Sequence, residues 1–244
     1  MEFIGEPAIS RGVVERRFDV KCEDRLVPGL LWTPEDAAGT RPLVLIGHGG
    51  SGDKRMPYVL SLARRLVRHL GFAAAAIDGP GHGDRAGATL SGTAPASSGI
   101  PRRFLGDMAE AAEAMTADWT ATYTALRELD EVGEGPLGYW GLSMGTMFGV
   151  PFVAATAEVR VAVLGLMGTF DPDMPWTTAA SQVTCPVLFL LQTDDELVSP
   201  KRGLDLFRTL GATDKRLHAH PGAHSAVPPE EIEASEAFLS KHLT

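Results

Sequence analysis

The sequence predicts an α/β fold in which a mostly parallel sheet of about eight strands is flanked by helices. From residue 43 onward, short apolar runs alternate with segments of helical periodicity. The runs are continuous in their apolar character, which is typical of strands covered on both faces, as parallel strands are. With 44% hydrophobic and 22% charged residues, the 244-residue chain is long and apolar enough to bury a full core.

The expected strands begin with a hairpin. Residues 11–20 and 25–33 are rich in β-forming side chains, and the polar residues 21–24 join them. Six further runs follow, of which the last is more polar and therefore suits an edge of the sheet. These runs cover residues 43–47, 72–77, 137–140, 159–167, 187–191 and 215–220.

Helices are expected between these strands. Apolar side chains in residues 57–70 lie on one stripe of a helix, and those in residues 107–130 do the same. Asp107 and Glu110 form a capping-box pattern, which predicts that the second helix begins at residue 107. Further helices are expected over residues 146–157 and 200–210 and from residue 229 onward.

No internal shift in composition divides the chain, so residues 1–244 are expected to form a single domain. Residues 84–106 lack periodicity and are rich in small and turn-forming residues, which is typical of a lid or a mobile loop. Arg102 and Arg103 in this segment would bind a substrate carboxylate if they face the pocket. Only about twenty residues connect the strand that ends at Met167 to the next strand, too few for a helical cap domain.

The strongest chemical signal is Ser143, with glycines two positions before and after it. This G-x-S-x-G pattern lies between the apolar run at 137–140 and the helix expected from residue 146. On such a strand-to-helix turn, glycines are needed because side chains would clash, and the serine hydroxyl is raised above the sheet. A serine that only caps a helix is the alternative interpretation, and the context favours a nucleophile.

A serine hydroxyl becomes a nucleophile when a base removes its proton and a third group orients that base. His224 follows the last predicted strand, and Asp194 and Asp195 follow the strand at 187–191. Because the carboxyl ends of parallel strands lie at one edge of the sheet, these side chains are expected near Ser143.

With these residues in this order, the chain resembles the α/β-hydrolases, and among them the small serine esterases and dienelactone-hydrolase-like members. The resemblance runs over nearly the whole chain and implies an α/β-hydrolase fold. Because dienelactone hydrolases themselves use a cysteine nucleophile, Ser143 directs the expectation to ordinary carboxylic esters. The matching motifs are Gly47-His48-Gly49-Gly50, Asp78-Gly79-Pro80-Gly81-His82-Gly83, Gly141-Leu142-Ser143-Met144-Gly145, Asp194-Asp195-Glu196-Leu197-Val198 and Pro221-Gly222-Ala223-His224.

The resemblance implies a role for each residue of the site. Ser143 is the expected nucleophile and His224 the expected base. Asp195 is favoured over the aspartate before it, because the D-x-x-V pattern of the family begins at Asp195. The backbone N–H groups of Met144 and Gly50 are expected to bind the oxyanion.

Residues for substrate binding are less clearly marked. Met167, Phe170 and Trp176 lie at the end of one predicted strand and in the connection that follows it. They would line an apolar acyl or alcohol pocket, or else pack the connection itself, and the sequence favours neither interpretation.

No cofactor is needed for this chemistry, and no metal site is expected. His218 and His220 share one face of the last predicted strand, but no carboxylate or cysteine cluster joins them in the sequence. The glycines before Lys54 only approach a phosphate-binding loop, because no Ser or Thr follows the lysine.

The composition also limits the partners and the compartment. A net charge of −9 disfavours nucleic acid, which requires a basic face. No apolar run approaches the ~20 residues of a membrane-spanning helix, and the N-terminus lacks the pattern of a secretory signal. We therefore expect a cytoplasmic protein that acts on a small-molecule ester, with a monomer and a homodimer both compatible with the sequence.

Other functions are compatible with parts of this pattern. The same machinery cleaves thioesters, amides or carbon–carbon bonds in some enzymes, or transfers the acyl group to an acceptor other than water. A non-catalytic ligand-binding module is a different class, because a fold alone does not imply an activity. Such a module has no need of a nucleophile, a base, an acid and oxyanion glycines together.

Overall fold

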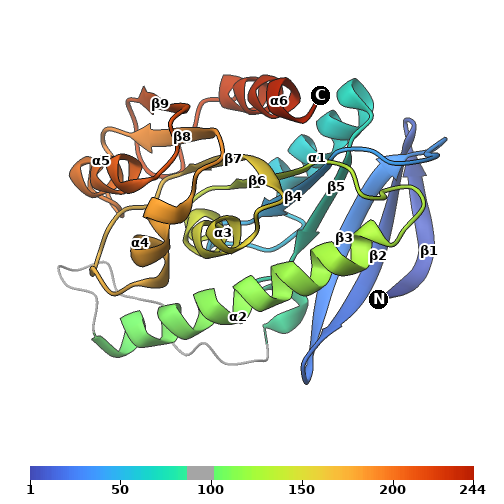
Figure 1. The fold of residues 1–244 in the computed structure, drawn as a ribbon, viewed down its shortest axis with the longest axis horizontal. Coiled ribbons are helices and arrows are strands. Elements are labelled where there is room, and N and C mark those ends of the chain that lie inside the picture. The colour runs from blue at the N-terminus through green and yellow to red at the C-terminus, as the bar shows by residue number, and fades with distance from the viewer. Residues whose placement is uncertain (87–101) are drawn as a thin grey trace.

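The computed structural model describes the backbone of residues 1–86 and 102–244 and the side chains of residues 1–86 and 107–244. Most of the predicted lid over residues 84–106, including the side chains of its two last arginines, lies outside the described residues. Figure 1 shows one sheet that runs across the molecule with helices on both of its faces.

In the described part of the chain, nine strands form one sheet in the order β1-β2-β3-β5-β4-β6-β7-β8-β9. The first three strands are antiparallel, and β3 also pairs antiparallel with β5. All the pairs from β5 to β9 are parallel, which confirms the mostly parallel sheet. The strands are β1 (Glu2–Ser10), β2 (Val13–Cys22), β3 (Arg25–Pro34), β4 (Leu43–Gly47), β5 (Ala73–Ile77), β6 (Leu137–Gly141), β7 (Val159–Gly165), β8 (Val187–Gln192) and β9 (Lys215–His220).

The first strand, β1, is the one that the sequence pattern does not predict. Its side chains are exposed apart from Phe3 and Ile4, so the apolar signal of a buried strand is absent. It is held at the edge of the sheet by backbone pairing with β2. The hairpin of β2 and β3 forms as predicted.

Helices cover the two faces of the sheet and bury a separate apolar core on each (Figure 1). The helices α1 and α6 pack on one face, and α2, α3, α4 and α5 pack on the other. The described helices are α1 (Pro57–Leu70), α2 (Arg102–Arg127), α3 (Met144–Ala155), α4 (Pro175–Ala179), α5 (Pro200–Thr209) and α6 (Glu230–Leu243), with short 3-10 turns η1 (Gly83–Arg85) and η2 (Ala180–Gln182).

The structure corrects the start of the long helix α2. It begins at Arg102 rather than at residue 107, so Asp107 and Glu110 lie inside the helix and do not cap it. The connection between β7 and β8, which is described throughout, contains only α4 and η2, in line with the absence of a cap domain. Among the described helices, none is both long and apolar enough to cross a membrane.

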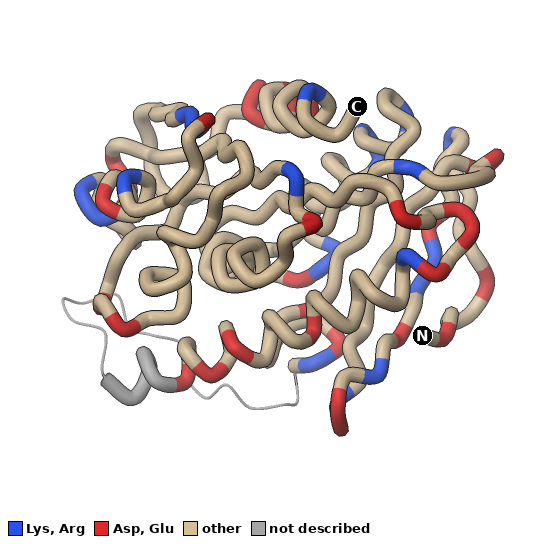
Figure 2. The backbone as a smooth tube through the Cα atoms, viewed as in Figure 1, with Lys and Arg blue, Asp and Glu red and all other residues tan. Residues whose placement is uncertain are grey.

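Charged residues are absent from β4, β5, β6 and β8 and gather on the outer elements and loops (Figure 2). Side chains on strands that are covered on both faces have no contact with water. A charged side chain there would lose its hydration, which costs several kcal/mol when no partner compensates for it. Around these four strands, charged side chains are therefore found only in the loops that follow or precede them.

One buried hydroxyl ties two central strands to the helix between them. Thr146, in the first turn of α3, has no exposed surface. Its Oγ1 lies 2.7 Å from the carbonyl oxygens of Gly141 and Gly165 and accepts the N–H of Gly165 at 2.7 Å. The contact fastens the ends of β6 and β7 to the start of α3.

We expect Thr146→Val to destabilise the fold by about 1–3 kcal/mol, because valine has the same shape but leaves these backbone groups without their partner. Urea unfolding followed by circular dichroism measures the change. Thr209→Val is the matched control, since its hydroxyl bonds to the Asp205 carbonyl on the exposed side of α5. That variant should lie within about 0.5 kcal/mol of the wild type. Equal effects of the two substitutions would contradict the role assigned to Thr146.

Candidate active site

Three polar side chains meet at the carboxyl ends of the parallel strands. Ser143 follows β6, Asp195 follows β8 and His224 follows β9. The Nε2 atom of His224 lies 2.9 Å from Ser143 Oγ, and its Nδ1 atom lies 2.7 Å from Asp195 Oδ2. The structure thus brings together three of the residues that the sequence predicted for the site, although 81 and 29 positions separate the two pairs.

The backbone at Ser143 adopts a conformation that residues with a side chain rarely take, with φ 58° and ψ −119°. Close backbone contacts hold it there. A Cβ atom on Gly145 would lie 2.6 Å from the Gly47 carbonyl oxygen, and one on Gly141 would lie 2.7 Å from the Gly145 oxygen. Ser143 precedes α3, yet its hydroxyl makes no capping hydrogen bond with the described helix, so it is available to His224.

Asp195 holds the imidazole in one orientation. Its Oδ2 accepts the hydrogen bond from His224, and its Oδ1 accepts the N–H groups of Leu197 and Val198, each at 2.8 Å. Burial raises the pKa of Asp195, but the hydrogen bonds from His224 and from the two backbone amides outweigh it and leave that pKa below its ordinary value. The lowered pKa therefore favours the ionised form of the Asp195 carboxylate.

The acids on either side of Asp195 fasten the loop that carries His224. Asp194 Oδ2 accepts the N–H of Gly222 at 2.8 Å, so Asp194 does not share the imidazole. Glu196 Oε2 accepts the backbone N–H of His224 at 2.9 Å, and this hydrogen bond lowers the pKa of Glu196. The sequence reasoning missed Glu196, whose only signal was its place in a run of three acids.

The loop after β4 approaches the first turn of α3. The N–H of Gly49 donates to the Tyr58 hydroxyl at 2.7 Å and is therefore occupied. A Cβ atom on Gly50 would lie 3.7 Å from Met144 Sδ, so Gly50 and Met144 are neighbours. Met144 is the first residue of α3, where backbone N–H groups have no acceptor within the helix. The two residues predicted to bind an oxyanion thus lie side by side.

His48 fixes the peptide that carries the Gly50 N–H. Its Nδ1 donates to the Gly49 carbonyl at 2.8 Å, and its Nε2 accepts the Gly79 N–H at 2.9 Å. Because the peptide is planar and trans, fixing the Gly49 carbonyl also fixes the Gly50 N–H on the opposite side. Burial lowers the pKa of His48, which favours the neutral ring that this pattern requires.

Lys54 and Asp78 form a buried ion pair that supports the same loop, with 2% and 0% of their side chains exposed. Asp78 Oδ1 also accepts the Lys54 N–H at 3.0 Å, and Lys54 Nζ lies 2.8 Å from Asp84 Oδ2. Lys54 is thus held between two carboxylates and joins the loop after β4 to the loop after β5.

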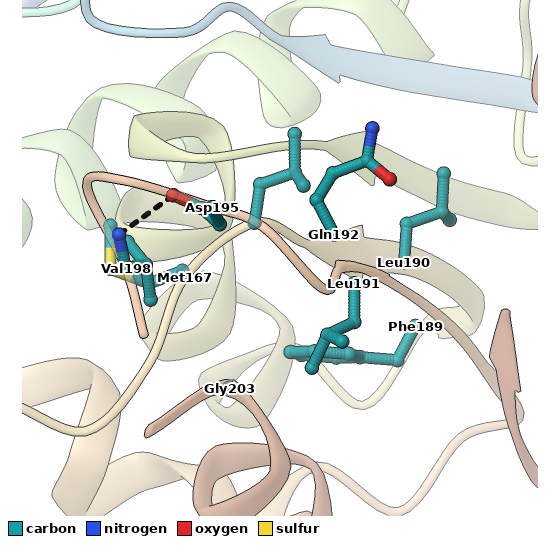
Figure 3. Close-up of a pocket in the computed structure, with 9 residues that line it drawn as sticks. Met167, Phe189, Leu190, Leu191, Gln192, Asp195, Val198 and Gly203 are labelled. Atoms are coloured by element: carbon teal, nitrogen blue, oxygen red, sulfur yellow. Dashed lines mark hydrogen bonds between the residues drawn. The ribbon is translucent and has the colours of Figure 1, made fainter. Parts of the chain in front are cut away.

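A small apolar pocket lies beside Asp195, on the side of β8 that α5 covers (Figure 3). It is bordered by the loop that carries the acid, and Ser143 is not part of its wall. Its lining residues are Leu166, Met167, Phe189, Leu190, Leu191, Gln192, Asp195, Val198 and Gly203.

Of the three residues expected to bind substrate, Met167 lines this pocket. Phe170 lies under the Arg202 guanidinium, whose carbon is 4.9 Å from the ring centre. Trp176 is fully buried, and its Nε1 donates to the Gly168 carbonyl at 3.1 Å. A side chain without exposed surface has no contact with a substrate, so Trp176 packs the connection, which corrects its place among the substrate-binding residues.

Comparison with known proteins gives full-length structural matches. A PEG-bound, cold-adapted esterase from an Arctic intertidal metagenomic library is 39% identical, covers 100% of both chains and has a TM-score of 0.84. A zinc-bound structure of a cold-adapted esterase from such a library is 38% identical, with the same coverage and a TM-score of 0.80. An acetyl xylan esterase from Paenibacillus sp. R4 is 17% identical over 99% of this chain and 88% of its own, with a TM-score of 0.76, and shows a likeness of fold alone. No family sequence model and no curated protein sequence matches the chain.

The lowered pKa of His48 predicts how stability depends on pH. The unfolded chain binds a proton at this residue at a higher pH than the folded chain does, so the contribution of His48 is fully present above about pH 6.5 and is lost as the pH falls toward the folded value. Between pH 7.5 and 5.5, the unfolding free energy should fall more in the wild type than in His48→Asn, by up to about 1.4 kcal/mol per pH unit. Urea unfolding at both pH values measures the difference. Parallel losses in the two proteins would contradict the neutral role of His48.

Proposed function

The chain belongs to the esterases of the α/β-hydrolase fold, and from this premise we propose that Ser143, His224 and Asp195 are the triad with which it cleaves carboxylic esters. The observation that carries the assignment is the unbroken series of contacts from the Ser143 hydroxyl through the imidazole to the carboxylate, at 2.9 and 2.7 Å. Both are hydrogen-bond distances, and the first is short enough for the Ser143 proton to pass directly to His224.

In the first half of the reaction, Ser143 Oγ attacks the ester carbonyl while His224 Nε2 takes the hydroxyl proton. Negative charge develops on the carbonyl oxygen, and the N–H groups of Met144 and Gly50 bind it. The tetrahedral intermediate then breaks its bond to the alcohol, which leaves with the proton from His224. Asp195 balances the charge of the imidazolium throughout. The product of this half is an acyl-Ser143 ester.

In the second half, a water molecule donates a proton to His224 and attacks the acyl carbon. The same N–H groups bind the second oxyanion, and the intermediate releases the carboxylic acid as Ser143 recovers its proton from His224. The residues need no redox or group-carrying cofactor for either half.

The compartment and the assembly of the enzyme are proposals from the sequence. The net charge of −9 supports an enzyme without a nucleic-acid partner, and two unpaired cysteines, Cys22 and Cys185, support a reducing, cytoplasmic setting. A homodimer stays a prediction that size-exclusion chromatography with light scattering decides.

We expect Ser143→Ala to lower kcat for p-nitrophenyl esters by about 10⁴–10⁶-fold, because it removes the nucleophile. Hydrolysis of the acetate through octanoate esters measures the loss and gives the acyl-length preference. Ser199→Ala is the control, since Ser199 precedes α5 without a side-chain capping bond in the described structure. A fluorophosphonate should label the wild type and Ser199→Ala but not Ser143→Ala. Full turnover by Ser143→Ala would overturn the assignment.

The two neighbouring aspartates give a matched pair. Asp195→Asn should lower kcat by about 10³–10⁴-fold, because the amide no longer balances the imidazolium charge. Asp194→Asn keeps a side-chain oxygen that can accept the Gly222 N–H and loses only the charge of that acceptor, so it should cost less than about tenfold. Steady-state kinetics with p-nitrophenyl acetate compare the two variants. A larger loss in Asp194→Asn than in Asp195→Asn would reverse the assignment of the acid.

A further inference from the structure

A second cluster of polar side chains joins β9 to α6. His218 Nδ1 lies 3.0 and 3.1 Å from the two carboxylate oxygens of Glu231, and His220 Nε2 lies 2.6 Å from Glu231 Oε1. One potential ligand atom from each residue lies within 4.8 Å of the other two. The sequence analysis found the two histidines but not the carboxylate, which lies in the next helix.

The local structure explains why these residues meet. Side chains two positions apart on a strand leave the same face, so His218 and His220 both point toward α6. Glu231 is the second residue of α6, and its N–H donates to the Pro228 carbonyl at 3.0 Å. Its side chain is 5% exposed, whereas those of His218 and His220 are 38% and 26% exposed. The carboxylate is thus fixed and buried, and the imidazoles are open to solvent from which an ion enters.

We propose that His218, His220 and Glu231 bind one divalent transition-metal ion of the zinc class. Two imidazole nitrogens and one carboxylate form a ligand set that zinc takes with a water in the fourth position. With bonds of ~2.1 Å in a tetrahedral site, neighbouring ligand atoms lie about 3.4 Å apart. The present spacing of 2.6–3.1 Å between imidazole nitrogens and carboxylate oxygens therefore has to widen by less than about 1 Å.

Gln192 is a separate observation on the same face. It pairs with His220 in the parallel register of β8 and β9, so the two side chains leave the sheet on one side. Figure 3 shows its amide on the opposite side of β8 from Phe189 and Leu191. Gln192 is 2% exposed, and neither its amide nitrogen nor its oxygen has a hydrogen-bond partner among the described residues. Buried amides are satisfied in native proteins, so the unpaired amide of Gln192 beside His220 indicates that a polar ligand occupies this face of the sheet.

The site brackets the loop that carries His224. His220 is the last residue of β9 and Glu231 lies in the first turn of α6, so residues 221–230 run from one ligand to the other. A bound ion ties both ends of this loop to each other. None of the three ligands belongs to the proposed triad, so a test of metal binding does not depend on the catalytic assignment.

The test is zinc binding by the full, metal-stripped chain in competition with a colorimetric zinc chelator. The wild type should bind one ion per chain. His218→Ala and His220→Ala should each weaken binding about tenfold or more, and Glu231→Gln should do the same. Mg²⁺ and Ca²⁺ prefer oxygen ligands and should not compete for the site.

Two controls separate this site from other zinc-binding groups. His69→Ala is the matched control, because His69 Nδ1 lies 2.8 Å from Glu236 Oε1 of the same helix α6, in a pair with a single imidazole. His224→Ala removes the imidazole of the triad. Both variants should bind zinc as tightly as the wild type.

Thermal unfolding gives a second measurement that does not depend on activity. At free zinc a hundred times Kd, the wild-type midpoint should rise by about 5–10 °C, and that of His220→Ala should not. Circular dichroism identifies the variants that are folded. The proposal is overturned if the wild type binds no zinc, if a folded variant lacking both His218 and His220 binds it as tightly, or if binding is lost with His224→Ala.

Discussion

The active site depends on one close backbone contact, between the first turn of α3 and the end of β4. Gly145 lies so near Gly47 that a Cβ atom would be 2.6 Å from the Gly47 carbonyl oxygen. This approach lets α3 begin directly at the carboxyl edge of the sheet, so that Ser143 and the Met144 N–H share that edge with Gly50. A side chain at position 145 would push the helix away and separate Met144 from Gly50, the two residues whose N–H groups we propose as oxyanion donors.

The opposite side of the site is held by three consecutive acids with three separate tasks. Asp195 orients the ring of His224, whereas Glu196 binds the backbone N–H of the same residue. Asp194 binds the backbone two positions earlier, at Gly222. The loop after β9 is therefore fastened to the loop after β8 by its backbone as well as by its imidazole, and these contacts hold His224 in position.

The features that depend on neighbouring residues in the sequence, namely the central strands and the turn at Ser143, could be predicted. Continuous apolar runs marked the central strands, and the glycines around Ser143 marked the sharp turn. The strand β1 could not be predicted, because its side chains are exposed and only its backbone pairs. The burial of Trp176 and the meeting of Glu231 with the histidines of β9 depend on how α4 and α6 pack on the sheet. The sequence pattern of a single helix or strand does not determine how α4 and α6 are placed against the sheet.

Two buried ionisable side chains of the candidate site have lowered pKa values, His48 in the loop after β4 and Asp195 in the loop after β8. Burial lowers the pKa of His48, which favours its neutral ring, and the neutral ring accepts the Gly79 N–H. Although burial alone would raise the pKa of Asp195, hydrogen bonds to its carboxylate leave that pKa lowered, so it stays ionised beside His224. One group is neutral and the other is negatively charged, but both are in their deprotonated form, and a lowered pKa preserves that form at lower pH. Protonation of His48 would cost the Gly79 N–H its acceptor, and protonation of Asp195 would weaken its hydrogen bond with His224. Because both pKa values are lowered, both contacts persist as the pH falls.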